Sequence, residues 1–183
     1  GVDVVVASGT KALAGQDRDM WGYIASRRVD LLNELMDLQA MRGGTLDWRR
    51  AVAILAGLGE ARQRFERRCQ TATELAAFLE GHPCVEEVFH PSLPGHTDAA
   101  VIAAHYTRPG SLLSFRVKDC DEEATRHFCD VLASTGIPRY ALSFDGLATK
   151  LNHHHSVSEY FTAQEEVSRI GVQRLVRVGV GVE

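Results

Sequence analysis

The stretch VDVVVASGTKALAG, residues 2–15, decides the fold. Its apolar, β-branched run stops abruptly at Ser8-Gly9-Thr10-Lys11. Such a run, bounded by small residues, predicts a buried strand of a parallel sheet. Because ligands bind at the strand ends of α/β sheets, the turn after this strand is a candidate site. The strand brings two hydroxyls and one amine to that turn.

The residue types in the turn suit one kind of cofactor. Partial desolvation beside apolar residues makes the neutral amine of a lysine a usable nucleophile, which we expect for Lys11. Ser8 and Thr10 can donate hydrogen bonds to a phosphate, and Gly9 lets the backbone approach it. An amine beside a phosphate cradle is what pyridoxal phosphate (PLP) requires. Taken alone, these four residues favour the alternative of an exposed loop lysine beside two turn-forming hydroxyls.

The length and composition are those of an ordinary globular protein. The chain has 183 residues, enough for one domain or for a domain with part of another, and 45% of them are hydrophobic. The net charge of −4 and the lack of a basic stripe argue against nucleic acid as a partner. No apolar run has membrane-spanning length and no signal-peptide pattern opens the chain, so we expect a cytoplasmic protein. A start at Gly1, directly inside a strand, predicts that an upstream part is absent.

The cysteines indicate a reducing compartment. They show no paired metal-ligand spacing, so the sequence predicts isolated, mostly buried thiols and no metal site. They are Cys69, Cys84, Cys120 and Cys129.

After a polar loop (residues 14–22) and a short strand (23–27), the chain is predicted to be mainly helical up to residue 80. Helical spacing covers residues 29–41 and stops at Gly43-Gly44. Asp47 is the expected N-cap of a long helical run to Glu80, softly interrupted at Gly57 and Gly59. The arginines of this run are predicted to lie on a solvated helix face. They are Arg62, Arg64, Arg67 and Arg68.

The remainder alternates strands and helices, which predicts a small α/β sandwich. Strands are expected at 85–89, 111–117, 140–144 and 175–182. The helix ending near residue 105 is expected to be capped by Thr97, and Asp121 opens another that ends at Gly136. The segment Thr162-Ala-Gln-Glu165 is a capping box before a helix that ends at Gly171.

Seven short motifs, in this order, carry a resemblance to a known family. They are ASGTKALAG (7–15), GGTL (43–46), AGL (56–58), RFERR (64–68), FLEGHPCVEEVFHPSLPGH (78–96), GSLLSF (110–115) and LVRVGVGVE (175–183). Each is weak alone, but their joint order is specific. The chain resembles the Cys/Met-metabolism family of PLP enzymes, and corresponds to roughly the second half of such an enzyme. That family includes cystathionine synthases and lyases, methionine γ-lyase and homocysteine-forming sulfhydrylases.

The resemblance implies a fold and a division into domains. It implies an α/β protein: the end of a fold-type-I PLP-dependent transferase large domain, followed by a small C-terminal α/β sandwich domain. Residues 1–50 would be the C-terminal part of the PLP-binding domain, and residues 51–183 the small domain. A homo-oligomer, a dimer of dimers, is implied as well. The missing N-terminal half of the enzyme would supply the rest of the site.

The resemblance also implies roles for single residues. Lys11 falls on the lysine that forms the Schiff base with PLP, and Ser8 and Thr10 fall on phosphate-binding hydroxyls. Arg177 falls on the arginine that binds the substrate α-carboxylate, a bidentate contact that lysine cannot make. Ser143 falls on a serine at the carboxylate side of the site. Without the resemblance, Arg177 and Ser143 would be taken as an ordinary arginine and serine at strand ends.

The implied activity is a PLP-dependent C–S lyase that acts by β- or γ-elimination on a sulfur-containing amino acid. The alternatives are a γ-replacement transferase that makes a thioether from an activated homoserine, and a non-catalytic or split subunit. Where many members carry a Val-Glu pair, this chain has Leu147-Ala148, which argues against cystathionine as substrate. The run His153-His154-His155 is predicted to be a polar loop on the substrate side rather than a metal site, with one histidine touching the ligand.

Overall fold

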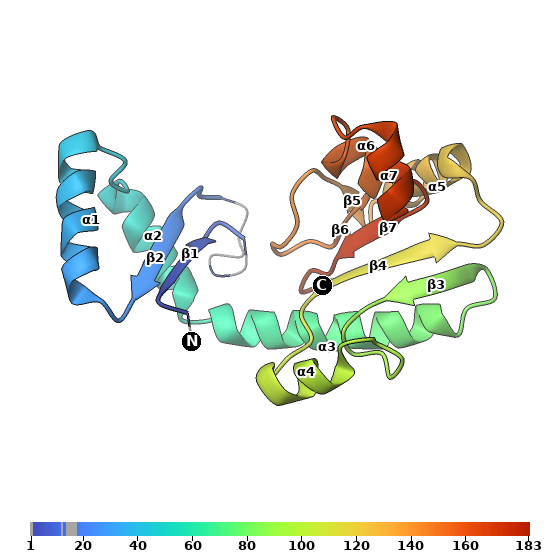
Figure 1. Cartoon of the computed structure of the whole chain (residues 1–183), viewed down its shortest axis with the longest axis horizontal. Coiled ribbons are helices and arrows are strands. Elements are labelled where there is room, and N and C mark those ends of the chain that lie inside the picture. The colour runs from blue at the N-terminus through green and yellow to red at the C-terminus, as the bar shows by residue number, and fades with distance from the viewer. Residues whose placement is uncertain (1, 12, 14–17) are drawn as a thin grey trace. The chain divides into compact units, whose positions relative to one another are not determined.

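The computed structural model describes residues 2–11, 13 and 18–183. The chain forms two compact units, Gly1–Arg62 and Gln63–Glu183 (Figure 1). The domain boundary predicted from the sequence, between residues 50 and 51, falls inside helix α2 (Trp48–Leu58). The boundary between the two compact units follows Arg62, twelve residues after the predicted domain boundary (62 − 50). The assignment of the two domains stays a prediction.

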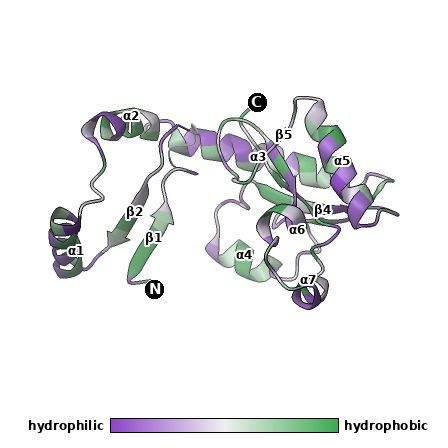
Figure 2. Cartoon of the chain, turned by 90° about the horizontal axis from the view of Figure 1, so that it is seen from above, coloured by the Kyte–Doolittle hydropathy of each residue, from purple (hydrophilic) through white to green (hydrophobic). Residues whose placement is uncertain are grey.

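The first unit contains a two-stranded sheet made by β1 (Val4–Ser8) and β2 (Gly22–Ser26). The strands are antiparallel, with Val4 opposite Ser26 and Ser8 opposite Gly22, so the prediction of a parallel sheet is wrong for the pairing seen here. Burial is also less than predicted, because Val6 is 74% exposed. A sheet of two strands leaves apolar residues uncovered unless other elements pack on both faces. Figure 2 shows how strongly hydrophobic β1 is.

Two helices follow in this unit, where the sequence predicted them. Helix α1 (Val29–Arg42) ends at Gly43 and Gly44, whose φ angles of 82° and 88° require glycine. Asp47 caps α2 as predicted: its side chain accepts hydrogen bonds from the backbone N–H groups of Arg49 and Arg50. The predicted long run to Glu80 is two helices, because α2 ends at Leu58 and α3 (Ala61–Glu80) begins after the break at Gly59.

The second unit is built on a five-stranded sheet with the order β3-β4-β7-β6-β5. The strands are β3 (Val85–Phe89), β4 (Leu112–Val117), β5 (Arg139–Tyr140), β6 (Lys150–His153) and β7 (Val176–Gly179). Only the β5–β6 pair is parallel; the other three pairs are antiparallel. In Figure 1, β7 lies between β4 and β6 at the centre of the sheet.

One face of this sheet is covered by two helices, α3 and α5 (Glu122–Ser134). Ala72 of α3 and Cys129 of α5 pack with Leu113, Leu151 and Val176 of the sheet in the buried core. Ala72 leaves room for close helix–sheet approach, and β-branched residues fill the central strand. The alternation of β7 places Val176 and Val178 on this core face, so Arg177 lies on the opposite face.

Three shorter helices complete the unit, and two of their predicted caps are wrong. Helix α4 (Ala99–His105) has Asp98, not Thr97, at its N-cap, and that position makes no side-chain capping bond. Helix α7 (Gln164–Ile170) has Ala163 at its N-cap. The hydroxyl of Thr162 donates instead to Glu159, 2.7 Å away, so the predicted capping box does not form. The third is α6 (His154–Ser158).

The segment 139–158 differs most from the sequence prediction. The strand expected at 140–144 shrinks to Arg139–Tyr140, and the strand β6 was not predicted. The three histidines do not form a loop: His153 ends β6 and is buried, and His154 opens α6. Hydrogen bonds between neighbouring strands stabilise β6 in a stretch whose polar residues gave no strand signal.

The arginine cluster and the thiols are only partly as predicted. Arg68 is 1% exposed, so it does not belong to a solvated helix face. Cys69 and Cys129 are buried free thiols, whereas Cys84 is exposed.

Within residues 2–11, 13 and 18–183, no helix is long and apolar enough to cross a membrane.

Candidate functional site

The turn after β1 is closed by Trp21. The backbone N–H groups of Gly9 and Thr10 both donate to the Trp21 carbonyl, over 3.0 and 3.2 Å. A Cβ on Gly9 would lie only 2.3 Å from the Trp21 indole, so glycine is required for this packing. The turn predicted from the sequence is therefore a defined structure, held by backbone hydrogen bonds to Trp21, the residue before β2.

The three predicted cofactor residues differ in how available they are. The side chains of Lys11 and Ser8 are exposed, which leaves an amine and a hydroxyl open to a ligand but does not supply the desolvation expected for Lys11. The Thr10 hydroxyl is 2.8 Å from the Trp21 N–H, which donates to it, and 3.2 Å from the Trp21 carbonyl, to which it donates. Its single O–H is thus used. The amine of Lys11 and the hydroxyl of Ser8 are available for the Schiff base and the phosphate of PLP. The phosphate contact predicted for Thr10 requires its hydroxyl to rotate away from the Trp21 carbonyl.

Arg177 lies in the central strand β7, on the face of the second unit's sheet that is opposite the α3–α5 core. It is opposite Ser114 of β4 and Asn152 of β6, and directly opposed residues of antiparallel strands share a face. Asn152 is buried, and its amide donates to the carbonyl of Ala141 over 2.9 Å. The buried Oδ1 of Asn152 accepts no hydrogen bond within the described part of the chain.

The guanidinium of Arg177 is held by an aromatic ring and a hydroxyl rather than by a carboxylate. Its central carbon is 4.0 Å from the centroid of the Phe144 ring, and Nη1 is 3.5 Å from the hydroxyl of Ser158. Burial lowers the pKa of Arg177, while the charge of Asp145 acts in the opposite direction. No ion pair joins Arg177 to a carboxylate of residues 63–183. A desolvated cation without an ion-pair partner can bind an anionic ligand.

The loop after β5 brings Phe144 to Arg177 because Asp145 is anchored. Asp145 has φ 68° and accepts hydrogen bonds from the buried Arg68 (3.2 Å) and from Ser111 (3.4 Å). The ammonium of Lys150 donates to the Asp145 carbonyl over 2.7 Å. The sequence interpretation missed this anchor, although an Asp-Gly pair signals left-handed backbone.

Ser143 lies on the same loop as Phe144, and its side chain is exposed. It does not contact Arg177 through any hydrogen bond between described residues, so its predicted place beside the substrate carboxylate stays a prediction. Lys11 belongs to the first unit, whereas Arg177 and Ser143 belong to the second.

The histidines are held by the protein itself. His153 is 2.6 Å from the Ser156 hydroxyl through Nδ1, and His155 is 2.5 Å from a carboxylate oxygen of Glu122. Burial lowers the pKa of His154, and the positive charge of Arg177 lowers it further. Among the residues that the structure describes, no group of three His, Cys, Asp or Glu side chains could hold a metal ion.

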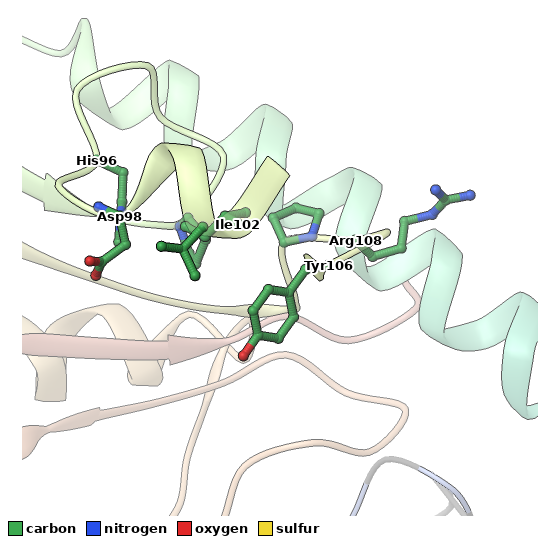
Figure 3. A pocket seen from close by; sticks show the side chains of 8 residues that line it. His96, Asp98, Ile102, Tyr106 and Arg108 are labelled. Atoms are coloured by element: carbon green, nitrogen blue, oxygen red, sulfur yellow. The ribbon is translucent and has the colours of Figure 1, made fainter. Parts of the chain in front are cut away.

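A separate cavity of about 330 Å³ lies beside α4. Figure 3 shows Ile102 and Tyr106 along it, with His96 and Asp98 at one end and the guanidinium of Arg108 directed away. Pro91, Val101 and Pro109 complete its lining. Neither Ser143 nor Arg177 lines this cavity, so it is not part of the predicted carboxylate site.

Comparison with known proteins identifies relatives of the whole chain. Residues 1–183 match the family described as Cys/Met metabolism PLP-dependent enzyme. The chain is 34% identical to cystathionine gamma-synthase 1, chloroplastic, of Arabidopsis thaliana, and covers 32% of that protein. It is 31% identical to cystathionine beta-lyase MetC of Bacillus subtilis, and covers 46% of it. Both matches include 100% of this chain, which thus spans less than half the length of either relative.

Solved structures match the fold over the same span. A cystathione gamma lyase, CalE6, from Micromonospora echinospora superposes with a TM-score of 0.90 at 25% identity. MetB from Corynebacterium glutamicum superposes with a TM-score of 0.88 at 29% identity. Each covers 100% of this chain, which in turn covers 47% and 46% of those chains.

These matches confirm the fold class predicted from the resemblance, an α/β part of a fold shared with PLP-dependent trans-sulfuration enzymes. They also confirm the predicted cofactor, because PLP is the cofactor of the matched family. Both synthases and lyases are found among the relatives. The chain belongs to the Cys/Met-metabolism family of PLP-dependent enzymes.

Proposed function

We propose that the protein containing this chain is a PLP-dependent carbon–sulfur lyase that acts by β- or γ-elimination on a sulfur-containing amino acid. The family match over residues 1–183 supports the chemistry class. Relatives named as lyases support the direction of the reaction; one is the L-methionine gamma-lyase of Porphyromonas gingivalis, at 28% identity. The chain covers 45% of that relative, and the proposal includes residues outside the chain that complete the active site.

The observation that carries the proposal is the state of Arg177. Its guanidinium is half-buried, stacked on Phe144 and without a carboxylate partner within residues 63–183. A planar guanidinium binds the two oxygens of a carboxylate through parallel N–H donors, which fixes both the position and the orientation of an amino acid. Arg177 therefore binds the α-carboxylate of the substrate, and Ser143 lies on the carboxylate side of the site.

Lys11 is the residue that holds the cofactor and moves the proton. When bound, PLP supplies an electron sink for the negative charge that develops at the substrate Cα. The Ser8 hydroxyl, and the Thr10 hydroxyl once turned from Trp21, hold the phosphate. The amine of Lys11 takes the proton from Cα. The side chain of Lys11 is exposed in the described chain, so its amine is accessible to a substrate.

The products follow from the bond that breaks. For sulfur on Cβ, loss of the Cα proton lets the C–S bond break; for sulfur on Cγ, a proton must be removed from Cβ as well before the C–S bond breaks. In both cases sulfur leaves with the bonding electron pair as a thiolate, which is then protonated. The unsaturated amino acid that remains takes up one water and yields ammonia and a 2-keto acid. One sulfur amino acid and one water thus give a thiol, ammonia and a keto acid.

Replacing Lys11 tests the first half of the proposal. Lys11→Ala should abolish release of the keto acid, and borohydride treatment should no longer attach the cofactor mass to the peptide that contains residue 11. Lys118→Ala is the matched control, because Lys118 is an exposed lysine elsewhere in the chain and should retain both properties. Turnover that survives Lys11→Ala would remove Lys11 from the mechanism.

Replacing Arg177 tests the second half. Arg177→Ala should raise KM for the amino acid by about tenfold to a hundredfold, since a charge-assisted hydrogen bond contributes about 1.5–3 kcal/mol. Arg177→Lys should recover only part of this loss, because an ammonium cannot make the bidentate contact. An unchanged KM in both variants would exclude Arg177 from substrate binding.

A γ-replacement transferase is the second candidate function. The first relative named above is a synthase, and another, from Pseudomonas aeruginosa, is an O-succinylhomoserine sulfhydrylase at 31% identity. Such an enzyme joins a thiol to an activated homoserine with the same lysine. Product analysis with and without an added thiol separates the two: a thioether formed only with thiol indicates the transferase, and keto acid formed without it indicates the lyase.

The assembly and location are part of the same proposal. We propose a cytoplasmic homo-oligomer, a dimer of dimers, in which the other half of the enzyme completes the site. The third alternative, a non-catalytic or split subunit, predicts that purified material has the mass of this chain together with a separate polypeptide. Intact mass measurement distinguishes one longer polypeptide from two associated ones.

A further inference from the structure

We propose that Phe144 is a positioning residue for Arg177, and that Gly179 provides the space in which its ring lies. The inference rests on the proposed function in one respect: it takes Arg177 to be the group that binds the substrate carboxylate. It explains how the chain holds that guanidinium in position to bind a carboxylate, although Arg177 forms no ion pair within residues 63–183.

The first observation is the stacking of the two side chains. The Arg177 guanidinium carbon lies 4.0 Å from the Phe144 ring centroid, well inside the range of a cation–π contact. The Phe144 side chain is 7% exposed, so the contact is largely shielded from water. Attraction between a cation and a ring face strengthens when water is excluded, because solvent screening is reduced. The ring therefore fixes one face of the guanidinium.

The second observation is the fit of the ring against Gly179. Residues 177 and 179 lie two apart on β7, so they share one face of the sheet. A Cβ placed on Gly179 would lie 2.7 Å from Cδ1 of Phe144 and 3.1 Å from its Cβ. Any side chain at residue 179 would push the ring out of its present place. Glycine is thus required here by a close approach and not by the backbone angle of the strand.

The third observation is that the loop holding Phe144 is fixed from behind. Asp145, the next residue, is bound through its side chain by Arg68 and through its carbonyl by Lys150. Arg68 is 1% exposed and also lies 3.5 Å from the carbonyl of Gly146. Because these contacts hold the backbone on the C-terminal side of Phe144, the ring has a firm support and the guanidinium stacks on a fixed surface.

The contact with Phe144 leaves most N–H donors of the Arg177 guanidinium available to a ligand. Within the described chain, Arg177 makes one side-chain hydrogen bond, to Ser158, out of the five N–H donors that a guanidinium has. Stacking restricts the plane of the guanidinium without using its N–H groups. Ordering a long side chain costs free energy on binding, and an arginine already held in place avoids much of that cost. Phe144 therefore increases affinity for a carboxylate without touching it.

The test compares two ligands on the holoenzyme by equilibrium titration. L-Alanine has an α-carboxylate and no leaving group, and L-alaninamide has the same skeleton without the carboxylate. Phe144→Leu keeps a bulky apolar side chain but removes the ring, and should weaken L-alanine binding about threefold to tenfold with no change for the amide. Phe144→Tyr keeps the ring and should bind L-alanine as the unaltered enzyme does.

Gly179→Ala tests the position of the Phe144 ring without changing Phe144 itself. It should weaken L-alanine binding to a similar extent, because the new methyl group displaces Phe144. Gly95→Ala is the matched control: its added Cβ meets no atom within 4 Å, and binding should not change. A second readout, the NMR resonance of the Arg177 Nε–H group, should shift in Phe144→Leu because the ring current is lost, and should stay near its original position in Phe144→Tyr.

The outcomes separate the inference from the function on which it rests. If Arg177→Ala abolishes the preference for L-alanine over the amide while Phe144→Leu and Gly179→Ala leave it intact, the positioning role is wrong and the carboxylate site stands. If Arg177→Ala also leaves the preference intact, both are overturned. An Arg177 resonance that does not move in Phe144→Leu would show that the stacking is absent in solution and would overturn the inference by itself.

Discussion

Asp145→Asn is predicted to destabilise the second unit strongly, because it removes the counter-charge of a buried arginine. Arg68 of α3 is 1% exposed, and its Nη1 lies 3.2 Å from a carboxylate oxygen of Asp145, whose side chain is 26% exposed. Nε and Nη2 of Arg68 are buried and have no hydrogen-bond partner within the described residues. The ion pair with Asp145 is therefore the main compensation for the desolvation of this guanidinium.

The size of the effect follows from the difference in burial between the two partners. Removing one member of a buried ion pair costs about 3–5 kcal/mol. Because Asp145 is partly exposed, we place the loss for Asp145→Asn at the lower end, about 3 kcal/mol in the free energy of unfolding. That corresponds to a fall in Tm of about 6–12 °C for a chain of this size. Arg68→Met should cost less, because the charge it leaves behind can be solvated.

The assay is urea unfolding of the chain, monitored by circular dichroism. The control is a second aspartate that has the same left-handed backbone conformation as Asp145. Asp119 also has a positive φ, 54°, but is exposed and makes no ion pair within the described chain. Asp119→Asn should therefore change the free energy of unfolding by less than about 0.5 kcal/mol. If Asp145→Asn cost no more than Asp119→Asn, or less than Arg68→Met, the electrostatic account of this anchor would be refuted.

The remaining predictions concern a cap, a thiol and a turn. Asp47→Ala should cost about 1 kcal/mol and speed hydrogen exchange at the start of α2, whereas Asp98→Ala should cost little, since Asp98 makes no side-chain capping bond. Burial raises the pKa of the Cys129 thiol to about 12, above its unfolded value of about 8.5. The buried neutral thiol therefore stabilises the fold fully below about pH 8.5, and this stabilisation is lost as the pH rises towards 12. Cys129→Ala should reduce the fall of the urea midpoint over this pH range. Native protein should react with thiol reagents at Cys84 but not at Cys129. Gly171→Ala should lower the free energy of unfolding by about 1 kcal/mol, because Gly171 ends α7 with φ 69°; an unchanged urea midpoint would contradict this reason.

Local patterns in the sequence predicted elements whose causes are local. Helix α1 ends where glycine permits a positive φ, and α5 begins where Asp121 caps it, its side chain accepting a hydrogen bond from the N–H of Ala124. Such features depend on residues within one turn of each other, so periodicity and caps suffice to predict them. The motif order likewise led to the family that the comparisons confirm, and so to PLP.

Long-range contacts were not predictable in this way. Arg68 looks like any surface arginine in its helix, and only the packing of α3 against the loop at Asp145, 77 residues later, makes it a buried partner. Strand β6 forms because β7 and β5 pair with it, although its own residues carry no strand pattern.

The sequence by itself determined the family, the cofactor and the candidate residues Lys11 and Arg177, because motif order and residue type suffice for these. The tertiary structure alone decided what surrounds Arg177: the ring of Phe144, the space left by Gly179 and the absence of a carboxylate partner within residues 63–183. The physical reason is that burial and stacking depend on which distant segments meet, and no short window of sequence contains both partners.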